Sequence, residues 1–183
     1  MRKIFFTLAA ALSVLAVHAQ ETNALKTEIE NFEARTNTVI VKGFGQVGAV
    51  SIGAGTVVVM TKESADISSG LRDYGIAVEL TGQNPPRQIA FLDEDELSPL
   101  ANGLDYLSKI TSDASALPAF TAEFKTRSGL CFAAHSSRRR STIEYFIQFA
   151  DGPRIAINTG EIVQLKNLVG QALNSINDLK QPK

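Results

Sequence analysis

The stretch 153–179, PRIAINTGEIVQLKNLVGQALNSINDL, joins a short apolar strand to one long amphipathic helix. Asn158 and Glu161 have the spacing of a capping box, which predicts that the helix begins between them. After this point apolar residues recur every three or four positions, as one helical face requires. These residues are Ile162, Leu165, Leu168, Val169, Ala172, Leu173, Ile176 and Leu179.

The stretch 87–110, RQIAFLDEDELSPLANGLDYLSKI, repeats this order of a short strand, a polar turn and an amphipathic helix. Four carboxylates, at residues 93–96, precede the helix. Four adjacent carboxylates could bind a metal ion, but acidic residues are also favoured at a helix N-terminus by the helix dipole. No calcium-loop spacing follows, so we interpret the run as a helix cap.

Each of these helices closes a run of strands. The pattern predicts strands at 38–42, 56–61, 74–80 and 87–92, and again at 119–126, 130–135, 142–149 and 154–157. Short turns between them favour antiparallel pairing. We therefore predict an α+β fold with two tandem β-β-β-β-α units, at 37–112 and 118–183, in which a closing helix covers one face of each sheet. A helix within 20–36 precedes them.

Residues 43–48, GFGQVG, match the dinucleotide-binding spelling GxGxxG. That motif binds a pyrophosphate only where a helix begins inside it. Here a new strand follows after seven residues, which leaves no room for the helix. We interpret the segment as a glycine-rich strand pair with a bulge or a close backbone approach.

The first nineteen residues have the features of a Sec-type signal peptide: a basic start, an apolar run at 4–16 and the small-residue ending VHA. The apolar run is shorter than a membrane span needs. We expect cleavage before Gln20, a periplasmic or secreted protein, and no membrane span in the mature chain.

The mature chain would hold 16 basic and 19 acidic residues, a net charge of −3. Residues 20–118 carry a net charge of −7 and residues 119–183 one of +4. Opposite charges on the two halves could favour self-association. A net acidic chain is not typical of a general nucleic-acid binder, because binding phosphates needs a surplus of Lys and Arg.

Residues with catalytic potential are few. Cys131 is the only cysteine and lies in an apolar strand, so we expect a small, at least half-buried side chain rather than a nucleophile. His135 would be the only histidine of the mature chain, and Ser136 and Ser137 follow it without a nucleophile-elbow motif. The sequence predicts no catalytic set, metal site or cofactor.

The doubled β-β-β-β-α pattern resembles the Pur-alpha and Whirly families of single-stranded nucleic-acid-binding domains. The step from strand to helix at 154–161, RIAINTGE, resembles that of the related transcriptional coactivator domain. The second unit, with 128–130 SGL and 136–140 SSRRR, also resembles an uncharacterised family of exported bacterial proteins. These resemblances imply the fold, single-stranded nucleic acid as one ligand, and a family without an assigned activity.

Basic residues of the second unit form the predicted ligand-binding set, with Phe146 as an aromatic that points away from the predicted core. We expect a non-enzymatic binding or structural module for an anionic ligand or a protein partner. Single-stranded nucleic-acid binding and a hydrolase with an unrecognised site remain as alternatives. The predicted binding residues are Lys125, Arg127, Arg138, Arg139, Arg140, Phe146 and Arg154.

Overall fold

The computed structural model describes residues 27–82, 86–137 and 142–181. Short helix α1 spans Glu28–Glu33. The first unit contains β1 (Ile40–Ile52), β2 (Gly55–Asp66), β3 (Arg72–Thr81), β4 (Gln88–Asp93) and α2 (Glu94–Lys109). The second contains β5 (Ala119–Lys125), β6 (Cys131–Ser137), β7 (Thr142–Gln148), β8 (Ile155–Ile157) and α3 (Thr159–Lys180).

The predicted α+β class is confirmed. The strands form two four-stranded antiparallel sheets, in the orders β1-β2-β3-β4 and β5-β6-β7-β8, and a helix follows each. The capping box of Asn158 and Glu161 is also present: the Asn158 side chain accepts a hydrogen bond from the Glu161 N–H at 3.0 Å. The helix predicted before the first unit appears as α1, and residues 20–26 lie outside the described part of the chain.

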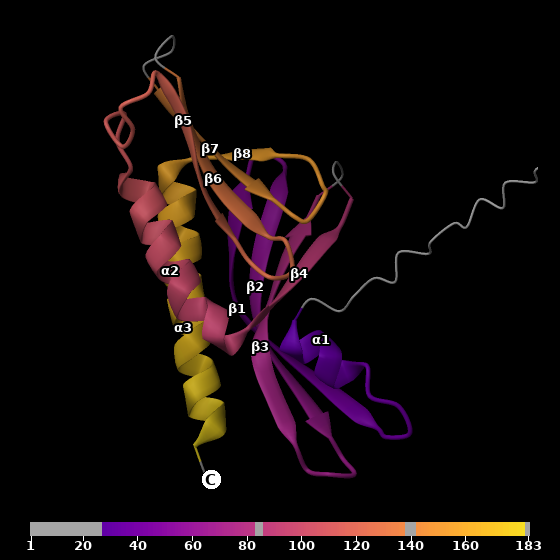
Figure 1. Cartoon of the computed structure of the whole chain (residues 1–183). Coiled ribbons are helices and arrows are strands. Elements are labelled where there is room, and N and C mark those ends of the chain that lie inside the picture. The colour runs from indigo at the N-terminus through magenta and orange to yellow at the C-terminus, as the bar shows by residue number, and fades with distance from the viewer. Residues whose placement is uncertain (1–26, 83–85, 138–141, 182–183) are drawn as a thin grey trace, which may run out of the picture.

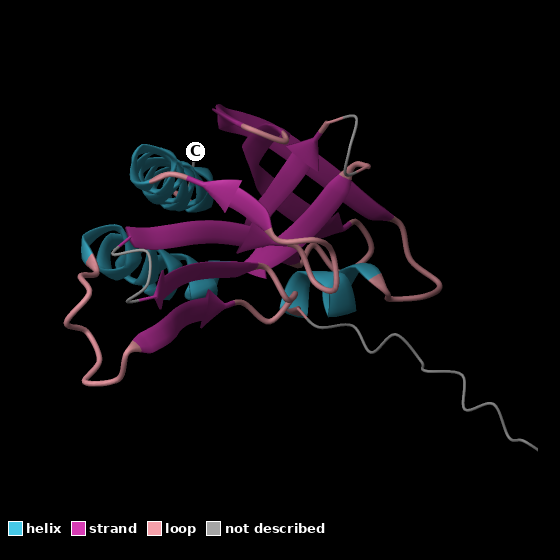
Figure 2. Ribbon diagram, turned by 90° about the horizontal axis from the view of Figure 1, so that it is seen from above, coloured by secondary structure: helices cyan, strands magenta, loops and turns pink. Residues whose placement is uncertain are grey.

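Helices α2 and α3 lie side by side on one side of the molecule and run in opposite directions (Figure 1). Lys166 of α3 contacts Asp105 of α2 at 2.9 Å, and Lys180 near the end of α3 contacts Glu94 at the start of α2. Viewed from above, the helix pair stands beside the two sheets (Figure 2). The paired helices therefore join the two units.

Each of the two long helices also packs on the sheet of the other unit. Helix α3 packs on β1 and β2 of the first sheet, where a Cβ at Gly48 would lie 2.5 Å from a methyl group of Leu168. Helix α2 contacts β3 and β4 of its own sheet and also β5 and β6, where a Cβ at Gly103 would lie 2.4 Å from the Phe124 ring. One continuous core results, with apolar residues from both sheets and both helices.

The GxGxxG segment lies inside β1, which continues through it as a strand. The pairing of β1 with β2 shifts register between Gln46 and Gly48. This irregularity confirms the interpretation of a bulged glycine-rich strand, and no helix begins there to hold a pyrophosphate.

The acidic run 93–96 lies at the start of α2, with Asp93 as the N-cap residue. The Glu96 side chain accepts a hydrogen bond from the Asp93 N–H at 3.2 Å. The Asp93 carboxylate also accepts hydrogen bonds from the N–H groups of Glu28 and Ile29, at 2.9 and 3.0 Å. This acidic segment therefore caps α2 and fixes the start of α1 on the first sheet.

Helix α1 packs on the face of the first sheet opposite α3 (Figure 1), where a buried ion pair holds it. Glu33 contacts Lys62 at 2.6 Å, and their side chains are 10% and 1% exposed. Glu33 also contacts Lys42 at 2.6 Å and accepts a hydrogen bond from the Ser64 hydroxyl at 2.5 Å. Burial lowers the pKa of Lys62, although the hydrogen bond with Glu33 offsets part of this effect.

Within the described residues, none of the helices combines the length and apolarity that crossing a membrane requires.

Candidate binding face of the second sheet

One face of the second sheet packs on the core, and the other faces outward. Alternation along the strands places Phe132, Ile147 and Ile155 in the core. We call the outward face the open face; it consists of Thr121, Glu123, Lys125, Cys131, Ala133, His135, Glu144, Phe146, Gln148, Arg154 and Ala156.

Phe146 lies at the centre of the open face. The strand register places it between Ala133 of β6 and Ala156 of β8. Both neighbours carry only a methyl group; the Phe146 ring is half-buried and Ala133 is buried. The sequence prediction that Phe146 points away from the core is therefore confirmed.

A groove of about 460 Å³ runs beside Phe146. It exists because β8 ends at Ile157 while the neighbouring β7 extends back to Thr142, so part of the β7 edge has no strand beside it. Apolar side chains form most of its wall. The lining residues are Ile143, Glu144, Tyr145, Phe146, Ala156, Ile157, Asn158 and Thr159.

Charges on the open face are balanced. Arg154, at the start of β8, reaches across the face to Glu123 of β5 at 3.6 Å. Lys125 lies at the same end and forms no ion pair with another described residue. With Glu144 at the opposite end, the described open face has two carboxylates and two cations.

Arg127 belongs to another part of the molecule. Its guanidinium donates to Asp93 at 2.6 Å and also contacts Asp95, and its backbone N–H donates to Glu96 at 2.8 Å. Hydrogen bonds to Asp95 and Asp93 raise the pKa of Arg127 further above its ordinary value. Arg127 thus links the second unit to the cap of α2, and its contacts are structural.

The remaining predicted residues, Arg138, Arg139 and Arg140, lie outside the described residues. Of the predicted set, the structure therefore brings together Lys125, Arg154 and Phe146 on the open face. It separates Arg127 from them.

A polar row crosses the other end of the open face. The Thr121 hydroxyl lies 3.1 Å from His135 Nδ1, and Glu144 is directly opposite His135 on the next strand. Cys131 lies on the same face towards Lys125, and burial raises the pKa of its thiol. The row can donate and accept hydrogen bonds, while the thiol is poorly suited to nucleophilic attack at neutral pH.

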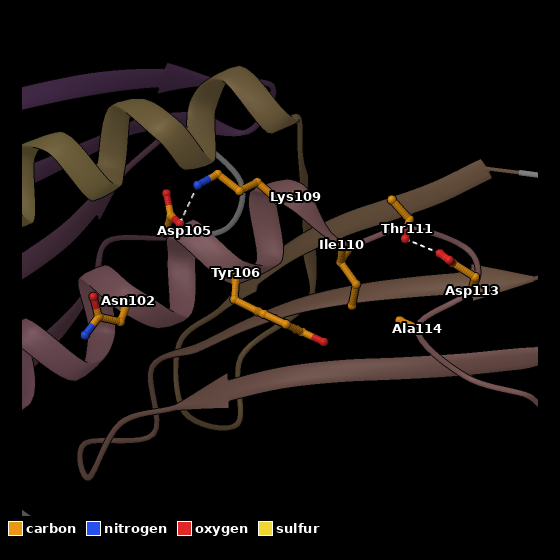
Figure 3. Close-up of a pocket in the computed structure, with 8 residues that line it drawn as sticks. All are labelled: Asn102, Asp105, Tyr106, Lys109, Ile110, Thr111, Asp113 and Ala114. Carbon is orange, nitrogen blue, oxygen red and sulfur yellow. Dashed lines mark hydrogen bonds and ion pairs between the residues drawn. The ribbon is translucent and has the colours of Figure 1, made fainter.

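A second groove, of about 490 Å³, lies at the end of α2 (Figure 3). Tyr106 in it is 62% exposed. Polar groups of this groove bind one another: Lys109 forms an ion pair with Asp105 at 2.7 Å, and the Thr111 hydroxyl donates a hydrogen bond to Asp113. This groove is separate from the open face and contains none of the residues predicted from the sequence.

Sequence reasoning did not predict the β7–β8 groove. Strand alternation, which can be read from the sequence, does place Phe146, Ala133 and Ala156 on the outward face. The groove depends on β8 being shorter than β7, a difference that the predicted strands 154–157 and 142–149 already contained.

Comparisons of the chain with protein-family models, with curated proteins and with solved structures find no significant match. Across the residues that the structure describes, no group of three or more His, Cys, Asp or Glu is placed to bind a metal ion. The function is therefore inferred from the open face itself.

Proposed function

We propose that the protein is an exported, non-enzymatic binding module that holds a polyhydroxylated polymer, such as an oligosaccharide, on the open face of its second sheet. The observation that carries the proposal is the position of Phe146, between two alanines and beside an apolar groove of about 460 Å³. A concave apolar site with a few polar groups around it is the usual form of a ligand site.

The polar residues around Phe146 support this ligand class. Carboxylates at Glu123 and Glu144 can accept hydrogen bonds from hydroxyl groups, and charge-assisted hydrogen bonds are the stronger kind. The flat ring offers an apolar surface to the C–H face of a sugar. The leader-like sequence at 1–19 would bring such a module to the cell envelope or outside the cell.

A single-stranded nucleic acid is the second candidate ligand. An outward aromatic ring can stack on a base, and the sequence between β6 and β7 contains the arginine run 138–140. Against this candidate, the charges of the described open face cancel, and Arg127 is bound to Asp93 and Asp95.

Isothermal titration calorimetry with three probes tests the proposal: a neutral chito-oligosaccharide, heparin and oligothymidylate. We expect chito-oligosaccharide to bind with little dependence on salt, and Phe146→Ala to weaken its binding at least tenfold. Tyr106→Ala removes an exposed aromatic from the other groove and is the matched control.

The three probes also separate the candidates. Oligothymidylate binding that falls steeply with salt would favour the nucleic-acid candidate instead. Binding of heparin alone would indicate charge recognition without the predicted stacking. If no probe binds, or if Phe146→Ala and Tyr106→Ala behave alike, the proposal is wrong.

A further inference from the structure

Strand β1 is an edge of the first sheet, and half of its backbone hydrogen-bonding groups point away from that sheet. The Ile67 N–H donates to the Val39 carbonyl at 3.1 Å, so the backbone of Val39 faces β2. Because the direction alternates along a strand, the backbone groups of Ile40, Lys42 and Phe44 face outward. These groups are the template onto which another strand can be added.

Natural edge strands are usually protected by charge, proline, bulges or short length. The first half of β1 has little such protection. It pairs regularly with β2 up to Gln46, and the only register shift follows there. Its one charged side chain is Lys42, whose ammonium group contacts Glu33 at 2.6 Å.

Apolar side chains flank this edge. Val39, Val41 and Ile67 are 67%, 50% and 63% exposed, and Phe44 on the opposite face is 53% exposed. Together they expose on the order of 400 Å² of apolar surface, divided between the two faces of the strand. A standard interface buries about 800 Å² per partner, so the backbone and polar neighbours would have to supply the remainder. The expected association is therefore reversible.

We propose that β1 pairs antiparallel with β1 of a second copy, around a two-fold axis at Gly43. In this register Val41 of one copy lies opposite Gly45 of the other, where there is no side chain to collide with it. Lys42 lies opposite Phe44, so cationic and aromatic side chains meet. Two-fold symmetric, self-complementary contacts of this kind are the commonest in soluble oligomers.

Charge and geometry disfavour two other registers, with the axis at Lys42 or at Val41. An axis at Lys42 would place two ammonium groups directly opposite each other, which is destabilising. An axis at Val41 would place Phe44 opposite Thr38, which precedes β1 and whose hydroxyl already donates to Asp66 at 2.5 Å. The inference stands independently of the ligand proposed for the second sheet, which lies on a different unit.

Disulfide crosslinking of cysteine variants tests the register directly. Residues at the axis would have Cα atoms about 4.5 Å apart if they form a non-hydrogen-bonded pair, within the range a disulfide spans. A Cβ at Gly43 would lie no closer than 3.8 Å to any neighbour, at Glu63, so Gly43→Cys is accommodated. In a Cys131→Ser background, this variant should form a disulfide-linked dimer under mild oxidation.

The matched control is Ser51→Cys, at an exposed residue in the far half of β1 beyond the bulge. In the proposed register it faces no residue of the partner's strand, so it should remain monomeric on a denaturing gel. Equal crosslinking of the two variants, or crosslinking of Ser51→Cys alone, would overturn the register.

Sedimentation equilibrium of the protein tests the association itself. We expect a concentration-dependent dimer, an association constant at least tenfold lower in Val41→Lys, and no change in Leu117→Lys, a 69% exposed control elsewhere. A monomer at every concentration overturns the proposal. So does a dimer that Val41→Lys leaves intact, which would indicate another surface or another partner for this edge.

Discussion

Replacing Glu33 with Gln should strongly destabilise the protein, because it leaves the Lys62 ammonium group buried without a counter-ion. Lys62 is 1% exposed and contacts Glu33 at 2.6 Å. The Phe91 ring lies 3.7 Å from its nitrogen and can replace only part of the lost attraction. Water cannot reach the group without displacing α1 from the sheet.

Removing one partner of a buried ion pair costs about 3–5 kcal/mol. For a domain of this size 1 kcal/mol lowers the melting temperature by roughly 2–4 °C, so the expected fall is roughly 6–20 °C. Lys42 also loses its contact with Glu33, but it is 46% exposed and water can replace that contact. In the double variant with Lys62→Met, most of the loss should be recovered because no buried charge remains.

The pH dependence provides a second readout. Burial would raise the pKa of Glu33, but hydrogen bonds from Lys42, Lys62 and Ser64 hold it below its ordinary value. The contribution of Glu33 to stability is therefore complete above about pH 4.3, the ordinary value, and is lost as pH falls through the folded value. The Glu33→Gln variant should lack this part of the acid sensitivity.

Lys62 acts in the opposite pH range. Its folded pKa is lowered, so the unfolded state binds more protons between the folded value and about 10.4. Stability should rise with pH across that window in the wild type. This rise should be absent from the double variant.

Urea unfolding followed by far-ultraviolet circular dichroism measures these effects. Glu79→Gln, which breaks the exposed pair with Arg87, is the control and should unfold close to the wild type. If Glu33→Gln also unfolds like the wild type, Lys62 is hydrated and α1 is not held by a buried ion pair. If the double variant is no more stable than Glu33→Gln, the loss does not come from the buried charge.

Further predictions concern the packing around two helix glycines, the burial of Cys131 and the ion pairs of Arg127. Gly103→Ala should destabilise the protein by about 1–3 kcal/mol in urea unfolding, because its methyl group meets the Phe124 ring, and Phe124→Leu should restore part of the loss. Gly170→Ala, with open space around it, should instead stabilise the protein by about 0.5–1 kcal/mol in the same experiment. A destabilised Gly170→Ala with an unaffected Gly103→Ala would mean that α2 does not approach β5. Cys131, whose thiol pKa is raised by burial, should react with iodoacetamide more slowly in the native protein than in urea near pH 8; equal rates would show an accessible thiol. Arg127→Lys should lower the urea midpoint, because one ammonium group cannot reproduce the contacts with both Asp93 and Asp95. An unchanged midpoint would show that these two ion pairs do not contribute to stability.

Local patterns predicted the elements well. The apolar repeat after Asn158 predicted α3, and the acidic run predicted the cap of α2. Strand alternation predicted which way Phe146 points, because the period of two depends only on neighbouring residues. The limits of the first-unit strands were less accurate: β2 continues to Asp66 and β3 begins at Arg72, beyond the predicted limits at 61 and 74.

Contacts between residues far apart in the sequence could not be predicted. Lys62 has the polarity of a surface residue, and only the docking of α1 supplies Glu33 and buries it. Arg127 was predicted to bind a ligand together with the other basic residues of the second unit. Its partners Asp93 and Asp95 come from the first unit, so the sequence did not show this contact. The packing of α3 on β1 depends on Gly48, and the packing of α2 on β5 depends on Gly103. At both glycines the missing side chain permits close approach.

The binding face of the second sheet is tested most directly by titrating the isotope-labelled protein with chito-oligosaccharide and following backbone amide chemical shifts. The proposal predicts that the largest changes centre on Ala133, Phe146 and Ala156, with little change at Tyr106. Shifts centred on the α2 groove, or no shifts at ligand concentrations up to the solubility limit, would contradict it.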